Sequence, residues 1–203
     1  MTLTTARRIH RAVLQRPKGL PFSQADFLMF GTRAAVDHAL ARLAKSGVID
    51  RLSRGIYVRP AVNRYIGKVT PMAEAVLAAI GRKTGERVQV CGAKAAAEFG
   101  FTTQHPLVTP YDTTGTTRRL NAGGREIALH HCNARKMVLA GRPAGVGLAA
   151  LWHLGPKRVD EAALARIEEV LDPREFRALR RVMVTQPAWL GAAFRRYQEV
   201  RPD

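Results

Sequence analysis

Acidic residues are scarce in this chain of 203 amino acids. Asp and Glu number 16 against 33 Lys and Arg, which gives a formal net charge of +17 at pH 7. Such an excess is far beyond what solubility requires, and it predicts a polyanionic partner: DNA, RNA or an anionic membrane surface. With 46% apolar and 24% charged residues, the composition is otherwise typical of a globular protein.

Cysteines and long apolar runs are also few. Cys91 and Cys132 are the two cysteines, too few for a disulfide framework or a four-cysteine zinc site. The longest uncharged stretch of interest, residues 143–156, is shorter than the roughly 18–20 residues that span a bilayer. The arginines near the start of the chain are not followed by the apolar segment of a secretory signal. We therefore expect a cytoplasmic protein with no membrane partner.

Positive charge is concentrated in the first third of the chain. Residues 1–66 hold 12 basic and three acidic residues, a net charge of +9, whereas residues 67–203 carry +8. Regular periodicity is lost over residues 63–71, where Gly67 and Pro71 stand. We therefore predict a basic N-terminal domain over residues 1–66 and a larger domain over residues 67–203.

Within the N-terminal domain, the pattern predicts three helices and then a two-stranded hairpin. The expected helices span residues 4–15, 23–28 and 32–46, and the expected strands span residues 48–52 and 56–60. Ser23 and Thr32 are typical N-cap residues, and Gly47 is typical of a helix end. Ser53 and Gly55 belong to the short turn between the strands. This order is that of a winged helix-turn-helix domain, in which the third helix binds a DNA groove.

The third helix and the hairpin supply the candidate DNA contacts. Apolar residues from Val36 to Leu43 share one helical face, so the opposite face can enter a major groove. Asp37 on that face repels phosphate, and we expect it to accept from a cytosine amino group or to pair with Arg33. A merely solvated charged face is the alternative interpretation. The predicted DNA-binding residues are Thr32, Arg33, Ala34, Asp37, His38, Arg42, Lys45, Arg51, Ser53, Arg54 and Arg59.

The remainder of the chain shows a mixed pattern. Helices are expected over residues 72–80 and 93–99, strands over 87–91, 107–111, 118–121 and 125–131, and helices again from residue 143 onward. Asp172, followed by Pro173 and then by Glu175, is typical of a helix start. The predicted fold class is therefore α+β, with the winged helix-turn-helix domain followed by a domain with a small sheet and a helical C-terminal half.

The sequence shows no convincing group of catalytic or metal-binding side chains. We therefore predict no catalytic residue, no metal and no cofactor. His130, His131 and Cys132 are adjacent, and successive strand residues point to opposite faces, so the three do not converge on one ion. No glycine-rich segment carries the Lys and the Ser or Thr of a phosphate-binding loop. The two cysteines are better explained as small core residues.

A second set of basic residues recurs in the larger domain. The helix expected from residue 173 places several arginines on one side at i,i+3 and i,i+4 spacing. They form either a solvated face, in part paired with Glu175 or Glu168, or a second contact with flanking DNA or structured RNA. The residues of this candidate second contact are Arg118, Arg119, Arg174, Arg177 and Arg181.

Two segments of the sequence resemble a known family. They are residues 31–60, GTRAAVDHALARLAKSGVIDRLSRGIYVRP, and residues 90–106, VCGAKAAAEFGFTTQHP, with YDTTG following at residues 111–115. In this order they are similar to the abortive-infection E type antitoxins of type IV toxin–antitoxin systems. The TTQHP run is the more specific match, because many winged helices share the first pattern.

The resemblance implies a bacterial antitoxin that binds double-stranded DNA at its own promoter and represses its operon. It also implies that the larger domain counteracts a nucleotidyltransferase-like toxin without a stable complex, and it leaves a stand-alone regulator open. Winged-helix regulators often occupy paired half-sites, so we expect a monomer or a dimer on DNA. The alternative is a module whose basic surface binds structured RNA or a protein; an enzyme is not expected.

Overall fold

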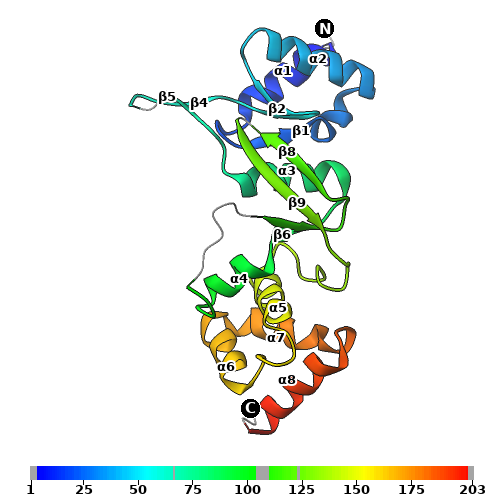
Figure 1. Cartoon of the computed structure of the whole chain (residues 1–203). Helices are drawn as coiled ribbons and strands as arrows, with labels where there is room; N and C mark the ends of the chain where they lie inside the picture. The colour runs from blue at the N-terminus through cyan, green and yellow to red at the C-terminus, as the bar shows by residue number, and fades with distance from the viewer. Residues whose placement is uncertain (1–3, 66, 104–109, 123, 201–203) are drawn as a thin grey trace. The chain divides into compact units, whose positions relative to one another are not determined.

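Helices and short strands build a mixed α+β fold, as the sequence predicted. The computed structural model describes residues 4–65, 67–103, 110–122 and 124–200 (Figure 1). The chain divides into two compact units, Met1–Glu86 with Arg119–Ile127 and Arg87–Arg118 with Ala128–Asp203. The domain boundary expected after residue 66 stays a prediction.

The first unit begins with the expected succession of helices and a hairpin. Its first elements are α1 (Thr5–Gln15), β1 (Pro21–Ser23), the 3-10 helix η1 (Gln24–Phe30), α2 (Arg33–Lys45), β2 (Asp50–Ser53) and β3 (Ile56–Val58). Thr32 caps α2, because its side chain accepts a hydrogen bond from the Ala35 amide at 3.4 Å. Gly55 has φ +74° in the β2–β3 turn, a conformation that costs glycine little. The order is compatible with a winged helix-turn-helix domain.

Strand β1 completes a three-stranded sheet in this unit. Strand β3 lies in the centre and pairs antiparallel with both β1 and β2. The helices and this sheet enclose one apolar core, so the face of α2 that was predicted to be apolar is buried. The fully or almost fully buried side chains of this core are Ile9, Val13, Phe22, Phe27, Val36, Ala39, Leu40, Ile49 and Tyr57.

Helix α3 (Ala73–Thr84) also belongs to the first unit. It lies against β1, and the Arg82 guanidinium donates a hydrogen bond to the Pro21 carbonyl at 3.1 Å. Between the sheet and α3, the segment that was predicted as a joint forms a hairpin of β4 (Ala61–Asn63) and β5 (Gly67–Val69). The strand residues of this hairpin are mostly exposed, so no alternation of apolar and polar residues marks it in the sequence.

The middle region of the chain forms a four-stranded sheet. Its strands are β6 (Val88–Val90), β7 (Tyr111–Thr113), β8 (Arg118–Ala122) and β9 (Arg125–His131), in the order β6-β7-β9-β8. Strand β7 pairs antiparallel with β6 and parallel with β9. The strand expected over residues 107–111 falls largely outside the described residues, and the strand that is described begins at its last position, Tyr111.

The second unit ends in a group of helices, as expected from residue 143 onward. Its helices are α4 (Gly92–Glu98), α5 (Pro143–Leu154), α6 (Glu161–Val170), α7 (Pro173–Arg181), the 3-10 helix η2 (Val182–Thr185) and α8 (Ala188–Val200). Asp172 caps α7 by accepting hydrogen bonds from the amides of Arg174 and Glu175 at 2.8 and 3.0 Å. Helix α5 is buried along most of its length. Within the described residues, no helix is long and apolar enough to cross a membrane.

Candidate nucleic-acid interface

The exposed face of α2 carries the side chains that were predicted to meet DNA. Arg33, Ala34, His38, Arg42 and Lys45 are all exposed, because the opposite side of the helix is fixed in the core of the first unit. Asp37 on the same helix is half-buried. Arg33 and Asp37 both take part in further interactions within the molecule.

A shallow hollow of about 570 Å³ follows this face toward α1. Its lining includes three of the predicted residues, His38, Arg42 and Lys45, together with Thr5 and Ala6 from α1. The structure therefore brings the last two turns of α2 beside the start of α1, on a surface that is basic and solvent-exposed.

The β2–β3 hairpin presents two more of the predicted arginines. Arg51 and Arg54 are both exposed, and the Arg51 Nε donates a hydrogen bond to the Ser53 carbonyl at 3.4 Å. The left-handed Gly55 follows directly after Arg54, so Arg54 lies in the tight turn of the hairpin. In a winged helix this is the part that reaches a phosphate or a minor groove.

A second hollow, of about 260 Å³, brings α2, the hairpin and α3 together. Its lining holds four basic side chains, Arg33, Arg51, Arg54 and Lys83, against one acid, Asp37. The remaining lining residues are Gln24, Ala41, Gly55 and Tyr57. All of them belong to the first unit. Sequence reasoning placed Arg33, Arg51 and Arg54 on the candidate surface but not beside one another around one space.

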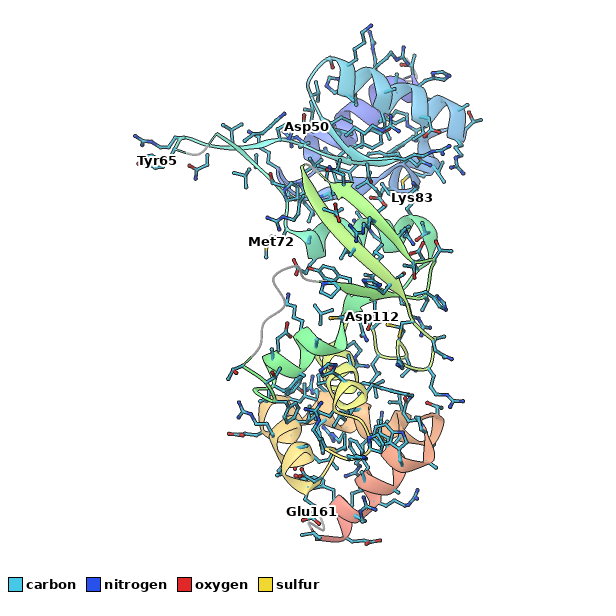
Figure 2. All side chains as sticks on the ribbon, in the orientation of Figure 1. Asp50, Tyr65, Met72, Lys83, Asp112 and Glu161 are labelled. Carbon is cyan, nitrogen blue, oxygen red and sulfur yellow. The ribbon has the colours of Figure 1, made fainter. Side chains whose placement is uncertain are left out.

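Lys83 was missed by the sequence analysis. It lies in the last turn of α3, outside the predicted DNA-binding domain, and Figure 2 labels it. Its Nζ donates a hydrogen bond to the Arg54 carbonyl at 2.6 Å. Burial lowers the pKa of Lys83, and the neighbouring charges of Arg54 and Arg33 lower it further, whereas Asp37 raises it. A pair of basic residues just beyond the helix predicted over residues 72–80, Arg82 and Lys83, was the available signal, but only the packing of α3 shows where they lie.

Arg59 differs from the other predicted contacts. Its Nη1 donates hydrogen bonds to the carbonyls of Leu14 and Arg16, each at 2.6 Å. These carbonyls lie at the C-terminal end of α1, where backbone acceptors have no partner within the helix. The structure therefore gives Arg59 a role in holding α1 to the sheet, and this role explains its presence without a DNA contact.

The five arginines of the candidate second contact differ in their local contacts. Arg118 donates to the Thr116 carbonyl at 3.0 Å, and exposed Arg119 forms an ion pair with Glu126 at 3.0 Å. On α7, Arg174, Arg177 and Arg181 are exposed. The acids that were considered as partners for them are engaged elsewhere.

Glu175 and Glu168 both act as hydrogen-bond acceptors in the second unit. Glu175 accepts hydrogen bonds from the Arg142 guanidinium at 2.7 Å and from the Ala144 amide at 3.0 Å. The Arg142 hydrogen bond is the largest cause that lowers the pKa of Glu175, and the Ala144 amide adds to it. Glu168 accepts a hydrogen bond from the Tyr197 hydroxyl. Both carboxylates therefore accept hydrogen bonds from residues outside α7.

The strand residues that belong to the second unit include a polar row next to α5. Gln89 on β6, Asp112 on β7 and His130 on β9 are cross-strand partners, and Asp112 is labelled in Figure 2. Burial raises the pKa of Asp112, whereas Lys136 and His130 lower it. Among the described residues, no group of three or more His, Cys, Asp and Glu side chains is placed to hold a metal ion. Cys91 and Cys132 are half-buried free thiols rather than the core residues that we expected.

Comparison of the sequence with known protein families finds a match. Residues 8–179 match the model of a family of unknown function, DUF6088. The chain belongs to this family. The DUF6088 match begins in α1 and ends in α7, so it includes α2, the hairpin and Lys83 as well as most of the second unit. No curated protein matches the chain.

Proposed function

We propose that this DUF6088 protein is a DNA-binding regulator of transcription and that its first unit binds double-stranded DNA upstream of its own gene. The observation that carries the proposal is the set of four cations from α2, the hairpin and α3 around one hollow. Beside it lies an exposed helical face with Arg42 and Lys45. A helix of this kind fits a major groove, and cations on both sides of it can contact the two flanking backbones.

The basic charge favours a nucleic acid over other partners. The protein carries +17 in total, and Asp37 is the one acid in the lining of the hollow between α2, the hairpin and α3. Cations that outnumber the acids on one surface attract a polyanion strongly and with a marked dependence on salt.

The resemblance of residues 31–60 and 90–106 supports a more specific role. We propose that the protein is the antitoxin of a type IV toxin–antitoxin system, which represses its own operon and counteracts a nucleotidyltransferase-like toxin. Expression of the neighbouring gene alone should arrest growth, and co-expression of this chain should restore it without co-purification of the two proteins. Growth arrest that this chain does not relieve would leave a regulator without antitoxin activity.

The experiment on DNA binding uses the full chain. Its affinity is measured by fluorescence anisotropy for the duplex upstream of its gene, for a scrambled duplex of equal length and for tRNA, at two salt concentrations. We expect the upstream duplex to bind most tightly, with affinity falling steeply as salt rises. Equal affinity for both duplexes, or tighter binding of tRNA, contradicts the proposal and favours the RNA-binding alternative.

The exposed arginines of α7 are the feature that favours the RNA-binding alternative. Arg174, Arg177 and Arg181 form an exposed basic face in the second unit. If tRNA binds more tightly than DNA, charge removal at these three positions should weaken RNA binding, whereas removal at Arg33 and Arg54 should not.

A further inference from the structure

The hollow between α2, the hairpin and α3 is lined by several basic side chains. Four basic side chains surround about 260 Å³, and they come from three separate elements of the first unit. Lys83 is the member whose surroundings are best defined. Its ammonium group has three donors, and the Arg54 carbonyl accepts one of them at 2.6 Å.

The backbone of the hairpin turn approaches Lys83 closely. A side-chain carbon added at Gly55 would come within 3.0 Å of the Lys83 Nζ and 2.6 Å of the Gln24 Oε1. Because glycine leaves this space open and also supplies the left-handed turn, the ammonium group reaches the hairpin beside Arg54. The end of α3 is thereby fixed to the tip of the hairpin.

Like charges in this arrangement repel one another. Arg54, Arg33 and Arg51 all make the charged form of Lys83 less favourable, and burial does so most of all. Asp37 and the hydroxyl of Tyr57 are the other titratable groups that line the space. One carboxylate does not balance four cations, so an anion that entered would relieve the repulsion.

We propose that this hollow binds a single phosphate group of the DNA backbone and that Lys83 is one of the residues that hold it. The proposal rests on the proposed function for the identity of the partner, and it adds a contact from α3, beyond residues 1–66. It also assigns this contact to positioning on the duplex rather than to recognition of base sequence.

The size and the lining of the hollow suit a phosphate group. The volume of about 260 Å³ corresponds to several water molecules, each of which takes about 30 Å³. A phosphate group with part of its hydration shell is small enough to enter such a space. Arginine forks and the compact lysine charge are the groups that bind phosphate oxygens in proteins.

The first experiment compares two lysine variants of the full chain. Lys83→Ala removes the proposed contact, and Lys157→Ala removes an exposed lysine of the second unit as a control. We expect Lys83→Ala to weaken binding to the upstream duplex and to the scrambled duplex by a similar factor, about tenfold, and to reduce the salt slope by about 1. Lys157→Ala should leave both quantities within twofold of the unchanged protein.

A second experiment locates the contact on the DNA. Single phosphates of the upstream duplex are replaced one at a time by neutral methylphosphonates. One such replacement should weaken binding of the unchanged protein at least as much as Lys83→Ala does, because it also removes the contacts of the arginines that line the hollow. It should cost the Lys83→Ala variant less than it costs the unchanged protein, because the Lys83 contact is already lost. Thermal melts of Lys83→Ala and of Lys83→Met test whether the loss is one of folding, and we expect both variants to melt close to the unchanged protein.

The outcomes separate this inference from the proposed function. If the unchanged protein prefers the upstream duplex but Lys83→Ala behaves like Lys157→Ala, the phosphate site is wrong and the regulator remains. If the protein does not bind DNA, inorganic phosphate decides the question. Phosphate that raises the melting temperature of the unchanged protein, and not that of Lys83→Ala, supports an anion site, whereas equal shifts overturn it.

Discussion

Arg54 and Arg59 carry the same charge five residues apart, but their surroundings differ. Arg54 is exposed in the hairpin turn, and its carbonyl accepts from Lys83. The Arg59 guanidinium instead donates to two carbonyls at the end of α1. Both arginines were predicted as DNA contacts because the sequence shows their charge and their position in a hairpin. Their hydrogen-bond partners become visible only in the folded unit.

We predict that Arg59→Ala destabilises the first unit. Two hydrogen bonds from a charged donor to helix-end carbonyls are lost, which should cost about 1.5–3 kcal/mol of unfolding free energy. Chemical denaturation followed by circular dichroism measures this. Arg59→Lys should recover part of the loss. An unchanged denaturation midpoint, together with a reduced salt slope of DNA binding, would instead identify Arg59 as a phosphate contact.

The helices and turns with strong local signals were the ones that the sequence predicted best. The apolar stripe from Val36 to Leu43 and the cap at Thr32 located α2, and the capping residue Asp172 with Pro173 located the start of α7. These signals act within a few residues of one another, so they need no knowledge of tertiary structure.

Features without a recognisable local signal were not predicted correctly. Residues 24–30 form a 3-10 helix rather than the expected ordinary helix, and the exposed β4–β5 hairpin has no alternating pattern. The same reason explains the missed Lys83, because α3 becomes part of the candidate site only by lying against β1. Packing of this kind has no local signature in a single sequence.

The cap of α7 gives a prediction for a single element. Asp172→Ala removes the acceptor of two helix-start amides, which should cost about 1 kcal/mol of stability. Asp172→Asn keeps a side-chain oxygen at the cap and should lose much less. Thermal melts of the two variants under identical conditions measure the difference. Equal losses would show that charge at this position matters more than the cap hydrogen bonds.

The link between α7 and the start of α5 should depend on pH. Because the Arg142 hydrogen bond and the Ala144 amide lower the pKa of Glu175 in the folded state, ionised Glu175 stabilises the fold above its unfolded pKa. This stabilisation is lost as the pH falls through the folded value. The melting temperature of Glu175→Gln should therefore lie below that of the unchanged protein at pH 7. The two should converge below about pH 4. A difference that is constant from pH 7 to pH 3 would contradict this account.

The molecule as a whole combines a strongly basic first unit with a second unit whose helices pack around the buried helix α5. The first unit places the exposed face of α2, the hairpin arginines and Lys83 on one set of connected elements. The second unit adds the exposed arginines of α7. Charge alone favours any polyanion, so the claim that distinguishes this account is preference for one duplex through the first unit.

The most direct measurement compares Arg54→Ala with Arg195→Ala, an equal loss of charge from an exposed position on α8. Their affinities for the upstream and the scrambled duplex are measured by fluorescence anisotropy at one salt concentration. The account predicts that the unchanged protein and Arg195→Ala both prefer the upstream duplex and bind it equally tightly to within about twofold. Arg54→Ala should bind this duplex about tenfold more weakly than either. Equal weakening by the two substitutions would contradict the account, because the first unit would then contribute nothing beyond its charge.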